Sequence, residues 1–299
     1  PTTTMTKLAY TARNDALFKM IFGDDRDIDI LTDFLQAVLD LPAEEYEEVT
    51  LADPHLARES PEDKLGILDV KVKTRSGKLI DIEIQVCDQP QMRERIVFYL
   101  ARMINEQIGP GDDYWTIKRT ICILITNYVL VPENESYRNR YTLRDPKTGS
   151  EFTDLVEIDV LELPKLPQDE DGTPLRDWMK FLSAQEKEEL TMLAKKNPQV
   201  KKAVVKLLAL TEDERARTLA DSREKLRRDI SAQIHAGEMR GWEEGREEGR
   251  EEGREEGREE GREEERRLVA RSLINLGHPV DVVVQATGLS REVVQSMLH

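Results

Sequence analysis

Two neighbouring segments alternate between apolar and polar residues, and this alternation constrains the fold more than any other feature of the sequence. Residues 66–74, GILDVKVKT, and residues 78–86, KLIDIEIQV, place an apolar side chain at every second position. A period of two is that of a β-strand with one buried face. The connection between them contains the turn dipeptide Ser76-Gly77, so the two segments are predicted to pair as an antiparallel hairpin.

The polar face of the predicted hairpin carries acidic side chains on both strands. Asp69 and Lys71 on the first strand share this face with Glu83 and Gln85 on the second. Two registers keep the polar side chains of both strands on one face. One has a three-residue loop and places Asp69 opposite Gln85. The other is shifted by two residues and places Asp69 opposite Glu83. In both, Asp69 and Glu83 are close enough to share a cation, and Mg²⁺ commonly uses only one or two carboxylates. The pattern predicts a Mg²⁺ or Mn²⁺ site, although a solvated strand face would show the same alternation.

The segments around the hairpin predict a mixed core of helices and strands. Apolar residues follow helical spacing over residues 14–22, 28–40 and 91–108, and strand-like patterns cover residues 49–51, 66–74, 79–86, 116–126, 140–143 and 153–163. Asn14 or Asp15 could cap the first helix. The order predicts an α/β fold of mixed α+β type for residues 1–165.

Two helical segments follow this core. The stretch PKLPQDEDGTP is typical of a linker, and residues 166–236 show helical periodicity without a catalytic constellation, which predicts a helical appendage. Residues 237–267 contain a Glu-Glu-Gly-Arg repeat, in which glutamate–arginine pairs favour a helix and each glycine disfavours it by about 1 kcal/mol. This helix is either a solvated spacer or a self-association helix with a glycine seam.

Residues 268–299 show three short helical patterns with the shape of a helix-turn-helix. Gly288 suits the left-handed end of one helix, and Ser290 suits the N-cap of the next. The last helix offers only Arg291 to a phosphate, so a packing or oligomerising role is favoured over DNA reading. The C-terminal helices are therefore predicted to join copies of the chain into a homo-oligomer.

The overall composition narrows the class of protein. The net charge of −16 leaves no basic arm, so a nucleic-acid partner would have to bind a local patch. Cys87 and Cys122 lie in apolar runs and are predicted to be buried thiols of a reducing compartment, and the histidines lack metal-ligand spacing. No signal-peptide pattern is present, and the longest apolar run is far shorter than the about 20 residues of a membrane span. We therefore expect a cytoplasmic protein without membrane contact.

Several segments together resemble one branch of the PD-(D/E)XK nucleases, the recombination-promoting nuclease and transposase family of bacteria. The segments are NDALFKMIFGD, ILDVKVKTRSGKLIDIEIQV, RERIVFYLARMINEQI, the Glu/Arg/Gly repeat and ATGLSREVVQSML, and the resemblance covers most of the chain. It implies a restriction-endonuclease-like core with a helical C-terminal extension. It also implies Mg²⁺-dependent DNA cleavage by an endonuclease and a link to recombination or mobile elements.

Position by position, the resemblance implies that Asp69 and Glu83 hold the metal and that Gln85 stands where the wider superfamily has a lysine. An amide can orient a water molecule, whereas an ammonium can also stabilise developing negative charge. Lys71 or Lys73 on the neighbouring strand is therefore a candidate for the missing cation.

Two helices add further candidates. Asp15 matches the acid of the family's first-helix motif, and the resemblance implies that it is a further metal ligand or positions one. The alternative is that Asp15 serves only as the N-cap of the helix. In the helix over residues 91–108, Arg95, Tyr99 and Arg102 share one face and could contact phosphates and stack on the substrate. The alternative is that Tyr99 packs on the sheet and the two arginines pair with acids.

Three functions are compatible with these patterns. Asp69 and Glu83 favour a metal-dependent DNA endonuclease, whereas Gln85 and the acidic composition favour a catalytically decayed nuclease fold that acts as a self-associating interaction module. A DNA-binding regulator acting through the C-terminal tail would depend on Arg291, and this single basic residue disfavours it.

Overall fold

The computed structural model describes residues 6–55, 69–169 and 172–298. The chain divides into two compact units, Pro1–Asp229 and Ile230–His299, each with its own hydrophobic core. The first unit contains the hairpin and every candidate site residue.

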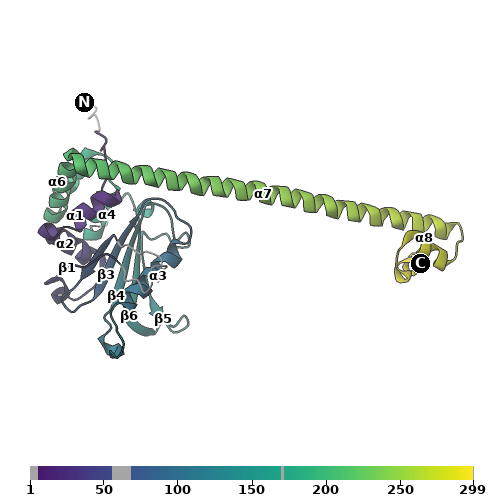
Figure 1. Ribbon diagram of the computed structural model, residues 1–299, viewed down its shortest axis with the longest axis horizontal. Coiled ribbons are helices and arrows are strands. Elements are labelled where there is room, and N and C mark those ends of the chain that lie inside the picture. The colour runs from purple at the N-terminus through teal and green to yellow at the C-terminus, as the bar shows by residue number, and fades with distance from the viewer. Residues whose placement is uncertain (1–5, 56–68, 170–171, 299) are drawn as a thin grey trace. The chain divides into compact units, whose positions relative to one another are not determined.

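Within the described residues, a mixed sheet of six strands forms the centre of the first unit (Figure 1). In the order β1-β2-β3-β4-β6-β5, its strands are Thr50–Leu51 (β1), Val70–Lys73 (β2), Leu79–Gln85 (β3), Thr120–Thr126 (β4), Glu151–Glu162 (β6) and Arg138–Arg144 (β5). The central strands β3, β4 and β6 are parallel, and the other strands pair antiparallel with their neighbours. The predicted α/β fold of mixed type is thereby confirmed.

Helices make up most of the remaining described chain. Their bounds are Asp15–Phe22 (α1), Ile28–Val38 (α2), Met92–Asn105 (α3), Pro174–Ser183 (α4), Lys187–Leu193 (α5), Pro198–Glu212 (α6), Glu214–Asn275 (α7), Val280–Thr287 (α8) and Arg291–Ser296 (α9). Short 3-10 helices lie at Asp25–Asp27, Ala43–Tyr46, Tyr114–Thr116 and Leu163–Lys165. The predicted helices and strands of the core are confirmed with ends that differ by a few residues, and residues 66–68 of the first hairpin strand lie outside the described residues.

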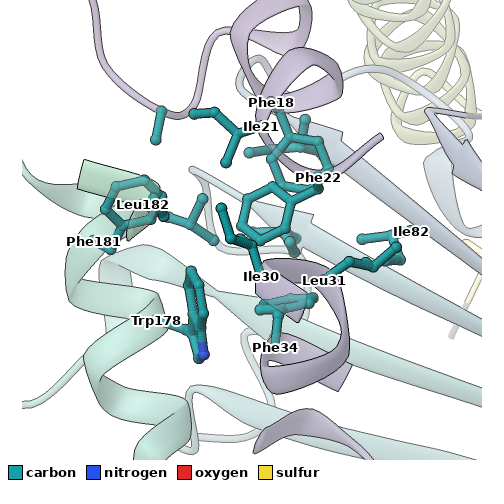
Figure 2. Close-up of a cluster of buried hydrophobic side chains, with 14 of the residues drawn as sticks. Phe18, Ile21, Phe22, Ile30, Leu31, Phe34, Ile82, Trp178, Phe181 and Leu182 are labelled. Atoms are coloured by element: carbon teal, nitrogen blue, oxygen red, sulfur yellow. The ribbon is translucent and has the colours of Figure 1, made fainter. Parts of the chain in front are cut away.

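One face of the sheet is covered by helices from both ends of the first unit. Figure 2 shows the aromatic cluster at the centre of this layer, whose neighbouring ring centroids lie 4.6–5.9 Å apart. The cluster consists of Phe18, Phe22, Phe34, Trp178 and Phe181. Ile82 of β3 belongs to the same buried core. The helices after residue 166, α4 and α6 included, therefore share one core with the sheet.

α3 covers the opposite face of the sheet. Its buried side chains pack against Cys122 and Leu124 of β4. These side chains are Met92, Ile96, Tyr99, Leu100 and Met103. Because side chains alternate along a strand, Asp81 and Glu83 of β3 share this face with Cys122 and Leu124. Cys122 is buried as predicted, whereas Cys87 is partly exposed because it lies beyond the end of β3, so the prediction of a buried thiol is wrong there.

The hairpin adopts the register shifted by two residues, in which Lys71 lies opposite Asp81. This register brings Asp69 across from Glu83. The alternative register with the loop Ser76-Gly77-Lys78 is wrong: the Thr74 N–H donates a hydrogen bond to the Lys78 carbonyl at 3.0 Å, so the three residues of the loop are Arg75, Ser76 and Gly77. Gly77 in this connection has φ 91°, a left-handed conformation that favours glycine.

The second unit contains α7 from Ile230 onward and the helices α8 and α9. Its small core consists of Ala270, Val283, Leu289 and Val294. Gly288, with φ 68°, ends α8, and Ser290 Oγ accepts a hydrogen bond from the Val293 N–H at the start of α9, so both predicted end residues are confirmed. None of the described helices is both long enough and apolar enough to cross a membrane.

The repeat of residues 237–267 is helical throughout, as part of α7. A Cβ added at its glycines would meet no other atom within 4 Å. This glycine stripe is therefore unpacked within the described chain, and its use in self-association stays a prediction.

Glu157 and Asp159 form a buried carboxylate pair on β6 that makes stability depend on pH. Arg138 and Arg140 of β5 approach Asp159 Oδ1 with Nε at 3.5 Å and 3.3 Å. Burial, and next the hydrogen bond with Glu157, raise the pKa of Asp159 from 3.8 to about 7. The stability that protonated Asp159 contributes is therefore complete below about pH 4 and is lost as the pH rises through about 7.

We expect Asp159→Asn to remove this loss, because an amide does not titrate. The free energy of unfolding should then fall less between about pH 5 and about pH 8 than it does in the wild type. Urea unfolding over this range measures the difference, with the exposed Asp154 of the same strand as the control position for Asp154→Asn. An identical pH dependence in the wild type and Asp159→Asn would contradict the assignment.

Candidate functional site

Asp69 and Glu83 lie side by side on the two strands of the hairpin. The backbone N–H of Asp69 donates a hydrogen bond to Glu83 Oε1 at 2.9 Å, and the backbone N–H of Ile84 donates one to Asp69 Oδ2 at 2.9 Å. Each carboxylate is therefore held by the backbone of the opposite strand. The side chain of Asp69 is 10% exposed and Glu83 is 1% exposed, so Asp69 is the more accessible of the two.

Burial gives both carboxylates a high proton affinity. Removal from water raises the pKa of Asp69 and raises the pKa of Glu83 well above its ordinary value. After burial, the negative charge of Asp81 is the next cause that raises the pKa of Glu83. The site therefore holds negative charge that its surroundings do not fully compensate, and a divalent cation would relieve it.

Asp81 is a third acid of this group. It is fully buried two residues before Glu83, with Oδ2 at 3.5 Å from Cys122 Sγ and with no hydrogen-bond partner for Oδ1 among the described residues. Burial, followed by the negative charge of Asp69, raises the pKa of Asp81 well above its ordinary value. Sequence reasoning did not single out Asp81, although its shared parity with Glu83 was an available signal.

Lys19 of α1 forms an ion pair with the hairpin. Its Nζ lies 3.0 Å from Asp69 Oδ1. The side chain of Asn14 caps α1 by accepting hydrogen bonds from backbone N–H groups of the first turn. The apolar face of the helix packs into the core, and Lys19 lies at the border of this face. The residues of this apolar face are Ala16, Leu17, Phe18, Ile21 and Phe22. The sequence analysis missed Lys19, although it lies within the segment NDALFKMIFGD.

Lys71 and Lys73, the two lysines of the first hairpin strand, have neighbours other than Asp69. Lys71 Nζ lies 2.5 Å from Glu106 Oε2, just after α3. Lys73 lies at the turn end of the hairpin, opposite Leu79. Of the residues predicted near the pair, the structure brings Gln85 there, with Nε2 at 3.4 Å from Glu83 Oε2.

α3 brings two of its three predicted phosphate-contact residues toward the acids. Arg95 Nε donates a hydrogen bond to the Tyr99 hydroxyl at 2.7 Å, and Tyr99 is buried against the sheet. Burial raises the pKa values of Asp81 and Glu83, and the positive charge of Arg95 partly offsets this rise. Arg102 instead lies 6.0 Å from the ring centre of the exposed Phe98.

Asp15 of α1 forms an ion pair with the start of α7. Asn14 caps α1, so the interpretation of Asp15 as the N-cap is wrong. Asp15 Oδ2 lies 3.5 Å from Arg223 Nε of α7, and its negative charge adds to the effect of burial in raising the pKa of Asp69. The buried Ala220 lies three residues before Arg223 and accepts a hydrogen bond from Asn14, so helical spacing places Arg223 near α1.

Arg13 and Arg227 add positive charge beside the end of β3. Arg13 donates a hydrogen bond to the Asn127 side chain, and the Asn127 N–H donates one to the Gln85 carbonyl at 2.9 Å. Burial, and next the positive charge of Arg227, lower the pKa of Arg13. These cations lie at the carboxyl end of parallel strands, where open α/β sheets bind ligands. Neither was a candidate from the sequence: Arg13 lies just before the first-helix segment, and Arg227 lies in residues 166–236, where no functional residue was expected.

The donor set of the hairpin fits a hard divalent cation. Among the described residues, no group of three or more His, Cys, Asp or Glu side chains has the arrangement of a metal site. Mg²⁺ does not require such a group, since it usually binds one or two carboxylates and completes its shell with water and phosphate oxygens. The carboxylate oxygens of Asp69 and Glu83 match this preference.

Comparison with known proteins identifies a family. A family model described as PD-(D/E)XK nuclease family transposase matches residues 12–237. The matched region includes the whole sheet, α1 to α6 and the first part of α7. Searches of the curated proteins and of the solved structures find no significant match.

Proposed function

The chain belongs to the PD-(D/E)XK nuclease transposase family, and on this premise we propose that it is a metal-dependent DNA endonuclease that serves recombination or mobile elements. The observation that carries the proposal is the Asp69–Glu83 pair, in which the opposite strand's backbone holds each carboxylate. Family membership supports the nuclease class, and the buried acid pair supports dependence on a divalent ion.

The hairpin residues would divide between ligand and positioning roles. Asp69 and Glu83 would hold Mg²⁺ or Mn²⁺, which when bound activates water and neutralises charge that builds on phosphorus. Gln85, next to Glu83, would orient the attacking water through its amide. The water oxygen bonds to phosphorus as the bond to the leaving sugar oxygen breaks, and Arg13, Arg95 and Arg227 supply positive charge for the DNA backbone.

DNA is the proposed partner, and the C-terminal helices are proposed to join copies of the chain. Exposed apolar side chains on α7 support self-association, among them Trp242, Leu268 and Val269. A pair of copies would supply one hairpin site for each strand of a duplex.

Cleavage of supercoiled plasmid by the full chain tests the proposed activity. We expect nicked or linear DNA in Mg²⁺ or Mn²⁺ at low salt and no product in EDTA. Addition of the ion should also raise the Tm, because a ligand that binds only the folded state stabilises it. No cleavage together with an unchanged Tm would contradict the proposal and favour an interaction module with a decayed site.

A further inference from the structure

The carboxylate pair has a cation beside it that comes from outside the hairpin. Lys19 Nζ lies 3.0 Å from Asp69 Oδ1, whereas the other oxygen of this carboxylate accepts the Ile84 hydrogen bond. The third position of the hairpin motif is an uncharged amide, so it brings no positive charge to the pair. Lys71, on the neighbouring strand, is only 8% exposed and its ammonium pairs with Glu106. Lys19 is thus the lysine that the geometry places on a proposed metal ligand.

Lys19 is accessible from solvent while it contacts Asp69. Its side chain is 31% exposed and lines an open hollow of about 720 Å³. Asp15 lies one helical turn before Lys19 but pairs with Arg223. A lysine ammonium has three donors on a flexible stem, so it can contact a carboxylate and a phosphate oxygen in turn.

We propose that Lys19 is the active-site cation of this chain and that it exchanges with the metal at Asp69. The inference rests on the proposed nuclease function. Without a bound ion, the Lys19 ammonium balances Asp69. With a divalent ion on this carboxylate, the ammonium is released to stabilise the negative charge that builds on the scissile phosphate. Lys19 would thus supply from the first helix the charge that a lysine supplies in the third position of the (D/E)XK motif.

Lys19→Met is expected to have different effects on metal binding and on cleavage. Loss of the competing cation should make the affinity for Mn²⁺ tighter. Loss of a positioned charge should lower cleavage at saturating Mn²⁺ by about 100-fold. Lys19→Arg keeps the charge and should recover part of the cleavage. A lysine that only stabilised the fold would lower the Tm without lowering cleavage by the folded, metal-saturated protein.

Two lysines provide matched controls. Lys206 lines the same hollow but pairs with Asp24 at 2.8 Å and Asp27 at 2.6 Å, which lie after α1 rather than on the hairpin. Lys206→Met should therefore keep cleavage within about twofold of the wild type. Lys71→Met tests the cation expected from the sequence, and its effect on cleavage should be smaller than that of Lys19→Met.

The experiment combines Mn²⁺ titration calorimetry with plasmid cleavage at saturating Mn²⁺, on full-length variants. Tighter affinity with lowered cleavage in Lys19→Met supports the proposal. Unchanged or weaker Mn²⁺ binding, or cleavage equal to the wild type, overturns it. If the wild type binds Mn²⁺ but cuts no DNA, the proposed nuclease function fails, and the affinity of Lys19→Met still decides whether the exchange occurs. A wild type that binds no Mn²⁺ overturns both.

Discussion

Glu83→Gln is expected to abolish DNA cleavage while it stabilises the metal-free protein near neutral pH. Cleavage should fall by at least about a thousandfold, because a neutral amide is a poor ligand for Mg²⁺ and several kcal/mol of transition-state stabilisation depend on the ion. The fold should tolerate the change, because the amide oxygen can still accept the hydrogen bond from the Asp69 N–H. The site would thus lose its function without losing its shape.

The gain in stability should increase with pH. Burial, followed by the charges of Asp81 and Asp69, raises the pKa of Glu83 well above its ordinary value of 4.5. The stability from its protonated form is complete below that ordinary value and is lost as the pH rises through the raised pKa, whereas glutamine shows no such loss. Thermal unfolding in EDTA over a pH series measures this difference.

Glu94→Gln is the matched control, since Glu94 lies exposed on α3. It should change neither cleavage nor the pH dependence of the Tm. Cleavage by Glu83→Gln at the wild-type rate would remove Glu83 from the active site. A lower Tm at every pH would show instead that the carboxylate stabilises the fold.

Trp178→Ala is expected to lower the free energy of unfolding by about 3–5 kcal/mol. Trp178 is fully buried, and its ring lies 5.6 Å from Phe22 and 5.9 Å from Phe34 between ring centres. Its Nε1 donates a hydrogen bond to Asp33 Oδ2 at 2.9 Å, so truncation also leaves that acceptor with one partner fewer. The loss should affect the whole first unit, because α4 shares its core with α1, α2 and the sheet.

Urea unfolding followed by circular dichroism measures the effect of Trp178→Ala. The control is Trp115→Ala, since Trp115 is 77% exposed and its removal should change stability by no more than about 0.5 kcal/mol. A separate early transition for α4 to α6, with the sheet still folded, would show that these helices are an independent layer.

The local patterns of the sequence predicted the hairpin and the helices well. Strict alternation identifies both strands of the hairpin, and the caps Asn14 and Ser290 follow from short-range hydrogen bonding. The register did not follow, because a shift of two residues keeps every side chain on the same face. The two pairings differ only in whether the three-residue loop consists of residues 75–77 or of residues 76–78.

Contacts between distant segments could not be predicted in the same way. Lys19 meets Asp69 because α1 lies against the hairpin, and Arg223 meets Asp15 because the start of α7 lies against the start of α1. Helical periodicity shows that a segment has a buried face, but it does not show what covers that face. For this reason the helices after residue 166 were expected to form an appendage, whereas in the structure their apolar faces pack into the same hydrophobic core as the sheet.

The reciprocal hydrogen bonds between the hairpin strands link the strand register to the arrangement of the two carboxylates. A hairpin slipped by two residues would keep its apolar side chains in the core but would place Asp69 opposite Gln85 and break both backbone contacts to the carboxylates. Apolar packing alone barely distinguishes the two pairings, whereas the ligand pair exists in only one of them. Under the proposed function, metal affinity would therefore report the strand register, and a divalent ion present during folding would select the correctly paired hairpin.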